Sequence, residues 1–216
     1  MKMFLRFGNM LVLALIILLA IVSFYHTGIF GKIFNKSYVS LITKSDIDYD
    51  NDDIDDYSDI LEGAKKFIDK KPRYKSAYYD GGYPTDDNYV CTDIIWFALK
   101  NAGYDFKKLI DEDISNNKKE YDEDVGDKNI DFRRVRNINV FLERNTMSLS
   151  VSSIDTFNPG DIVVYKDHIA IVSDRKNSKG INYILHHDGY HDYEDNGLFR
   201  KDIIGHYRWR LKDGSK

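Results

Sequence analysis

The chain of 216 residues contains little cysteine, little proline and no excess of positive charge. Its single cysteine, Cys91, excludes an internal disulfide. Only three prolines and few low-complexity tracts argue against a disordered chain, because a hydrophobic fraction of 43% is enough to build a core. A formal net charge of -4 argues against a nucleic-acid partner, which usually requires a basic face. We therefore expect one domain with appendages.

The N-terminal segment is the longest uncharged stretch of the chain. Lys2 and Arg6 precede it, and residues 7–31 carry no charge. At about 1.5 Å per residue, a helix of this length exceeds the roughly 30 Å hydrocarbon core of a bilayer. No small-x-small cleavage site is obvious after Ala20, which favours a retained signal anchor over a cleaved signal peptide. We expect residues 1–34 to form a cytoplasmic N-terminus and one transmembrane helix, with the domain outside the membrane.

An acidic segment, residues 35–57, follows and is predicted to be a solvated linker to a domain at residues 58–216. An alternative is a calcium loop, whose positions one, three and five would be Asp48, Asp50 and Asp52. An EF-hand requires glycine at position six and glutamate at position twelve, where this chain has Asp53 and Asp59. These departures favour the linker.

The hydrophobic pattern of the domain changes from helical to strand-like along the chain. Apolar residues at helical spacing predict three helices, the first two with Asp59 and Asn88 as caps. Those helices cover residues 59–71, 91–102 and 138–145. Short apolar runs between turn residues predict strands at 161–165, 168–173, 181–187 and 203–209. Helices followed by an antiparallel meander predict an α+β fold, with the N-terminal helices packed on the sheet.

Cys91 stands where a polar loop gives way to an apolar helical run. At the N-terminus of a helix, unpaired backbone N–H groups and the helix dipole stabilise a thiolate, which is the nucleophilic form of cysteine. The alternative is a packing residue, since free cysteines are often buried.

Histidines at two predicted strand ends could supply the base and the orienting group that a nucleophilic thiol needs. His168 begins one strand after a tight turn, and His186 and His187 end the next. Antiparallel pairing of these strands would bring the ends together. Alternation along the strand does not decide between His186 and His187, and Asp188 is a further orienting candidate. The alternative is a zinc site formed by His186, His187, Asp188 and His191. We do not favour it, because these residues do not have the helical His-Glu-x-x-His spacing of such sites.

Several short motifs occur in a fixed order between residues 59 and 210. They are Val90-Cys91-Thr92-Asp93, Asp131 with Arg133-Arg134-Val135, Pro159-Gly160-Asp161-Ile162-Val163, His168-Ile169-Ala170-Ile171-Val172-Ser173-Asp174, the His186 strand and Gly205-His206-Tyr207-Arg208. As a set they resemble a bacterial exported family catalogued as domain of unknown function 1287. That family looks like a branch of the NlpC-type cysteine peptidases and amidases, which share a papain-like α+β core.

The resemblance implies Cys91 as nucleophile, His168 as base and His186 as the third polar member. It leaves two departures, Phe132 and Arg136, where the family tends to have histidine and proline. Candidates for substrate binding are Tyr83, Asp93, Arg133, Arg134 and His187. An arginine pair could bind a substrate carboxylate, with an internal salt bridge as the alternative.

The function implied by the resemblance is a membrane-anchored, extracytoplasmic cysteine hydrolase that needs no cofactor or metal. Its expected substrate is an amide bond of peptidoglycan or of another cell-envelope peptide. The alternative is a non-catalytic cell-envelope binding module with the same fold. Peptidase and amidase activities both stay open.

Overall fold

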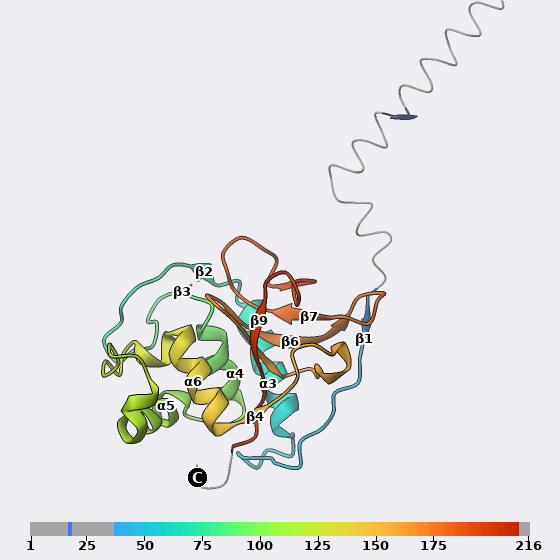
Figure 1. Ribbon diagram of the computed structural model, residues 1–216. Coiled ribbons are helices and arrows are strands. Elements are labelled where there is room, and N and C mark those ends of the chain that lie inside the picture. The colour runs from blue at the N-terminus through green and yellow to red at the C-terminus, as the bar shows by residue number, and fades with distance from the viewer. Residues whose placement is uncertain (1–16, 19–36, 212–216) are drawn as a thin grey trace, which may run out of the picture. The chain divides into compact units, whose positions relative to one another are not determined.

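The computed structural model describes residues 17–18 and 37–211 (Figure 1). The chain divides into two compact units, Met1–Ser37 and Tyr38–Lys216, and the second is described here. Among the described residues, no helix combines the length and the apolar character needed to cross a membrane. The predicted anchor falls, apart from residues 17 and 18, outside the described part of the chain.

A seven-stranded antiparallel sheet forms the centre of the second unit. Its strands are β1 (Tyr38–Val39), β4 (Met147–Ser148), β5 (Ile162–Tyr165), β6 (Ile169–Lys176), β7 (Asn182–Leu185), β8 (Glu194–Asp195) and β9 (Ile203–Arg208). They follow the order β4-β9-β5-β6-β7-β8, and β1 pairs with β6. The four longest strands are those predicted from the sequence, and the antiparallel pairing is confirmed.

Four α-helices accompany the sheet in the described residues. They are α3 (Asp56–Asp69), α4 (Asp93–Asn101), α5 (Phe106–Asn117) and α6 (Val135–Asn145). In Figure 1, α4, α5 and α6 gather beside the sheet, and α3 runs behind its strands. The mixed α+β class is therefore confirmed.

Both faces of the sheet are covered, as β5 shows most clearly. Successive side chains of a strand point to opposite faces. Ile162 and Val164 join the large apolar cluster that contains the helices, whereas Val163 and Tyr165 pack in a second cluster with Leu198. Both faces of β5 are therefore buried.

The start of α3 differs from the prediction. Asp55 is its N-cap and accepts hydrogen bonds from the amide and the hydroxyl of Ser58, at 3.4 and 2.7 Å. The prediction that Asp59 caps this helix is wrong, because Asp59 lies buried within the first turn. Asn88, predicted as the cap of the next helix, belongs instead to a short strand. Dense acidic residues in this region leave several candidates for a cap, and the pattern alone does not select among them.

The acidic segment that was predicted as a linker makes defined contacts with the rest of the second unit. Its strand β1 pairs with the end of β6. Asp46 accepts hydrogen bonds of 2.6 and 3.1 Å from Arg210. The ring of Tyr49 stacks on that of Tyr104 with centroids 4.1 Å apart. Residues 38–55 therefore pack along the domain.

Candidate active site

Cys91 lies directly before α4, where two parts of the fold meet. A short parallel pair, β2 (Arg73–Tyr74) and β3 (Asn88–Tyr89), leads into it. The backbone amide of Ile169, the first residue of β6, hydrogen-bonds the sulfur. The cysteine is only 7% exposed. The start of α4 and the start of β6 thus adjoin at the thiol.

The turn that carries Cys91 is held by Asp93. The carboxylate of Asp93 accepts hydrogen bonds from the Val90 amide at 2.7 Å and from the Trp96 indole at 2.8 Å. Arg133 adds two more, both 2.8 Å, and also donates to the carbonyl of Ala77 at 3.1 Å. The side chains of Arg133 and Asp93 are 1% and 0% exposed. They form an internal ion pair, the alternative to substrate binding considered from the sequence.

His168 follows the turn between β5 and β6. The Tyr165 amide donates to the His168 carbonyl at 2.8 Å and closes this turn. The Nε2 atom of His168 lies 2.9 Å from Nδ1 of His186. Because Ile171 pairs with Leu185 across β6 and β7, alternation puts both histidines on the same face at the same strand ends. The structure therefore brings His186, and not His187, within hydrogen-bond distance of His168.

His187 occupies a different environment from its neighbour. It is 2% exposed and lies among aromatic rings. Its ring centroid is 5.1 Å from that of Tyr74 and 5.5 Å from that of Tyr193. Burial lowers the pKa of His187, although the Arg73 backbone opposes this. The ring of His187 is thus packed among aromatic side chains, and it has no contact with His168 comparable to that of His186 among the described residues.

Two other predicted substrate-binding residues lie away from the thiol. Arg134 pairs with the exposed carboxylate of Asp124 at 3.1 Å. Tyr83 packs edge-on against Trp96 and lines a cavity of about 680 Å³. The lining of that cavity does not include the cysteine or its histidines. Neither residue is brought to Cys91.

Asp195 is a site residue that the sequence analysis did not find. It pairs with Ile184 across β7 and β8, and its Oδ1 atom lies 3.6 Å from Nε2 of His186. Its other oxygen accepts from Arg200. Although burial opposes the change, His186 and Arg200 lower the pKa of Asp195 and keep it a carboxylate. A two-residue strand carries no sequence signal strong enough to reveal this placement.

Asp188, the other orienting candidate, is engaged within its own loop. It accepts hydrogen bonds of 2.9 Å from the amides of Tyr190 and His191, and one of 2.6 Å from the His191 ring. Although burial opposes it, these bonds lower the pKa of Asp188 far below its usual range. Its Oδ2 atom is 4.0 Å from Nδ1 of His186. The histidine cluster considered for zinc does not bring three ligand atoms within 4.8 Å in the part of the chain described.

Tyr74 forms the partly exposed rim of the site and was also missed. It is in register with Tyr89, two residues before Cys91. A Cβ atom on Gly189 would lie 2.7 Å from Cβ of Tyr74, so the loop after β7 closes tightly on this ring. Burial raises the pKa of Tyr74, and the charge of Cys91 is the next largest influence. Tyr74 is 47% exposed, so part of its ring is open to solvent.

Burial controls the protonation of the thiol and its neighbour. It raises the pKa of Cys91 to about 11; the Ile169 amide opposes this rise, whereas the charge of Asp93 adds to it. Burial, and then the charge of His186, lowers the pKa of His168 to about 4. At neutral pH the free protein therefore holds an uncharged thiol at Cys91 and an uncharged imidazole at His168. This differs from the expectation of a ready thiolate, because burial outweighs the helix N-terminus.

Comparison with known proteins adds a family relationship. The profile of a family described as "Domain of unknown function (DUF1287)" matches residues 61–209. The "Uncharacterized protein YijF" of Escherichia coli (strain K12) is 32% identical in an alignment of length 167, which covers 71% of this chain and 82% of that protein. No solved structure matches the chain. The matched region includes Cys91, His168, His186 and Asp195.

Proposed function

This chain belongs to the DUF1287 family, and we propose that it is a membrane-anchored, extracytoplasmic cysteine hydrolase of the NlpC type that cleaves an amide bond of peptidoglycan. One observation carries the proposal. The His168–His186 hydrogen bond of 2.9 Å stands at the strand end where the Ile169 amide meets the Cys91 sulfur. A thiol two residues before a helix, followed in the chain by histidines at two adjacent strand ends, supports a papain-like core. The substrate class and the location rest on the family resemblance and the apolar N-terminus.

Proton transfer would accompany attack in this mechanism. As the sulfur of Cys91 bonds to the substrate carbonyl carbon, its proton passes to Nδ1 of His168, since Nε2 faces His186. An uncharged resting pair avoids the cost of burying two separate charges before substrate binds. These protonation states favour His168 as a general base over a preformed thiolate–imidazolium pair.

The same groups would complete the reaction. Backbone N–H groups at the start of α4, including that of Cys91, would stabilise the tetrahedral oxyanion. The imidazolium of His168 would then protonate the departing amine as the carbon–nitrogen bond breaks, leaving a thioester on Cys91. Water, deprotonated by His168, would hydrolyse the thioester and restore the thiol. His186 would orient His168, and Asp195 would orient His186.

The burial of Cys91 favours a second candidate function. The raised pKa and 7% exposure of Cys91 also fit a cell-envelope binding module that performs no turnover. Such a module would bind envelope peptides at the rim formed by Tyr74. It would bind them equally well without the thiol.

The test is digestion of purified peptidoglycan by the full-length protein in detergent. We expect the wild type to release fragments with new amino and carboxyl ends. Cys91→Ala and His168→Gln should release none. His191→Gln is a matched control because its exposed ring contacts Asp188, outside the proposed relay. If Cys91→Ala releases the same fragments as the wild type, or if neither releases any, peptidoglycan hydrolysis by this thiol is excluded.

A further inference from the structure

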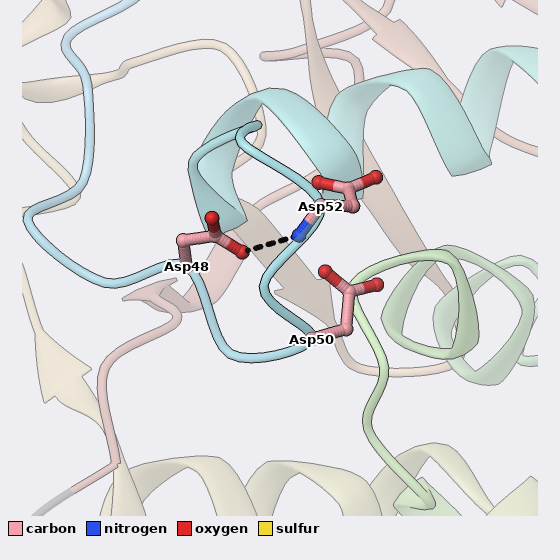
Figure 2. A group of neighbouring side chains, drawn as sticks. All are labelled: Asp48, Asp50 and Asp52. Atoms are coloured by element: carbon pink, nitrogen blue, oxygen red, sulfur yellow. Dashed lines mark hydrogen bonds between the residues drawn. The ribbon is translucent and has the colours of Figure 1, made fainter.

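Two groups of ionisable side chains lie beyond the thiol and its base, one in the acidic segment and one around β8. In the acidic segment, one carboxylate oxygen from each of Asp48, Asp50 and Asp52 lies within 4.8 Å of the other two (Figure 2). Asp48 accepts hydrogen bonds from the amides of Asp52 and Asp53 at 3.2 and 3.0 Å, which account for the shape of this loop. The group around β8 differs, because it contains buried polar atoms without hydrogen-bond partners among the described residues.

The contact between Asp195 and His186 contains two of these atoms. Oδ1 of Asp195 and Nε2 of His186 are both buried, and neither has a hydrogen-bond partner in the part of the chain described. They lie 3.6 Å apart, just beyond hydrogen-bond distance. Leaving a buried polar atom unpaired costs free energy, and hydrogen bonds of active sites are often long in the free enzyme and shorten when substrate binds. One shortened bond would pair both atoms.

Arg200 determines which oxygen of Asp195 faces His186. Its guanidinium donates a hydrogen bond to Oδ2 of Asp195, and its amide donates to the carbonyl of Gly197 at 2.9 Å. The turn at residues 197–200 packs closely on the carboxylate, because a Cβ atom on Gly197 would overlap Oδ1 of Asp195 and lie 2.9 Å from Nη1 of Arg200. The side chain of Asp195 is only 13% exposed, so these contacts fix its orientation. With Oδ2 held by Arg200, Oδ1 is the oxygen left for His186.

We propose that Arg200 is a positioning residue: it turns Asp195 toward His186 and so sets the tautomers of both histidines in the proposed relay. The ion pair with Arg200 keeps Asp195 a carboxylate, which only accepts hydrogen bonds. Nε2 of His186 must then carry a hydrogen, and Nδ1 of His186 is left to accept from Nε2 of His168, 2.9 Å away. Nδ1 of His168 stays without a hydrogen, which is the state that a base for Cys91 needs.

The opposite tautomers would disable the base. With its hydrogen on Nδ1, His186 would direct a bare Nε2 at the carboxylate of Asp195, and two acceptors would face each other. His168 would then accept at Nε2 and keep its hydrogen on Nδ1, where it could not take a proton from the thiol. Asp188 does not favour this arrangement, because its Oδ2 atom lies 4.0 Å from Nδ1 of His186 and accepts from the ring of His191. The use of this base rests on the proposed function, whereas the tautomers are a property of the free protein.

The test compares long-range proton–nitrogen NMR spectra of the histidine rings, which distinguish a bare nitrogen from an N–H group, in the full-length protein in detergent near neutral pH. In the wild type, His168 and His186 should both be bare at Nδ1, with signals assigned by their loss in His168→Gln and His186→Gln. Arg200→Gln should add the Nδ1–H tautomer of His168, because Asp195 is released. Arg200 is exposed, so this variant should fold. Gly197→Ala, which displaces Oδ1 of Asp195, should have the same effect, and Arg200→Lys should keep the wild-type tautomers.

Arg175→Gln is the matched control, because Arg175 pairs with Glu194, the neighbour of Asp195 in β8. The two arginines are similarly exposed, at 41% and 37%. Arg175→Gln should leave the spectra and kcat unchanged, whereas Arg200→Gln should lower kcat about tenfold and change KM less than about twofold. Wild-type tautomers in Arg200→Gln, the same change in Arg175→Gln, or a hydrogen on Nδ1 of His168 in the wild type would overturn the role of Arg200. The expected spectra in a wild type that releases no fragments would support that role and exclude peptidoglycan hydrolysis.

Discussion

The ion pair between Arg133 and Asp93 allows a sharp prediction about structure and function together. Replacing Arg133 with methionine keeps much of the side-chain volume but removes both 2.8 Å bonds to Asp93 and the one to the Ala77 carbonyl. Asp93 would remain a buried anion with two donors, the Val90 amide and the Trp96 indole. Arg133→Met should therefore destabilise the fold even though no substrate is present.

The magnitude follows from the burial of the pair. Removing one partner of a buried ion pair costs about 3–5 kcal/mol, and the two remaining donors place this case near the lower end. For a domain of this size, each kcal/mol lowers the melting temperature by about 2–4 °C. We expect a loss of about 3 kcal/mol and a melting temperature lower by about 6–12 °C.

The assay is denaturant unfolding of the full-length protein in detergent, followed by tryptophan fluorescence. Both tryptophans, Trp96 and Trp209, are buried in the domain and report its unfolding. Arg134→Met is the control: its side chain is 29% exposed, so its loss should cost less than about 1 kcal/mol. If Arg133→Met unfolds like the wild type but abolishes activity, Arg133 contacts substrate and the structural assignment fails.

Three further predictions concern the relay at the thiol. Asp195→Asn should lower kcat about 10- to 100-fold with little change in KM, because Asp195 would act through the orientation of His186. An equal loss in Asp192→Asn, in the loop just before β8, would contradict this. The pKa of about 11 for Cys91 predicts that the rate of alkylation by iodoacetamide rises about tenfold per pH unit between about pH 7 and 9, and a flat rate would refute the uncharged pair. Burial lowers the pKa of His168 from 6.5 to about 4. Between these two pH values the unfolded chain binds more protons than the folded protein does. The free energy of unfolding should therefore fall by about 3 kcal/mol as the pH drops from 6.5 to about 4. This loss of stability at acid pH should be smaller in His168→Gln. If His168→Gln shows the same pH dependence of unfolding as the wild type, His168 is not a buried neutral histidine.

The sequence predicted those parts of the site that local patterns determine. Antiparallel pairing brings the ends of β6 and β7 together, so His168 and His186 could be expected to meet. Alternation did not choose between His186 and His187, because both faces of these strands are partly apolar. The choice depends on the rings that pack against His187: Tyr74, which is more than one hundred residues earlier in the chain, and Tyr193, which lies in the loop after β7.

Other features depend on contacts that no local pattern records. Asp195 reaches His186 only because the two-residue strand β8 pairs with β7. Arg133 and Asp93 are forty residues apart and become partners through tertiary packing. The protonation of Cys91 was also misjudged from position alone, since its burial became visible only in the folded structure.

The central claim, that Cys91 is a nucleophile, is tested most directly by intact-mass spectrometry of the full-length protein quenched in acid during incubation with soluble peptidoglycan fragments. We predict a covalent adduct whose mass equals the acyl part of the cleaved substrate. Peptide mapping should place it on Cys91, and it should be absent from Cys91→Ala. Fragment release by the wild type with no adduct, together with undiminished release by Cys91→Ala, would contradict the account.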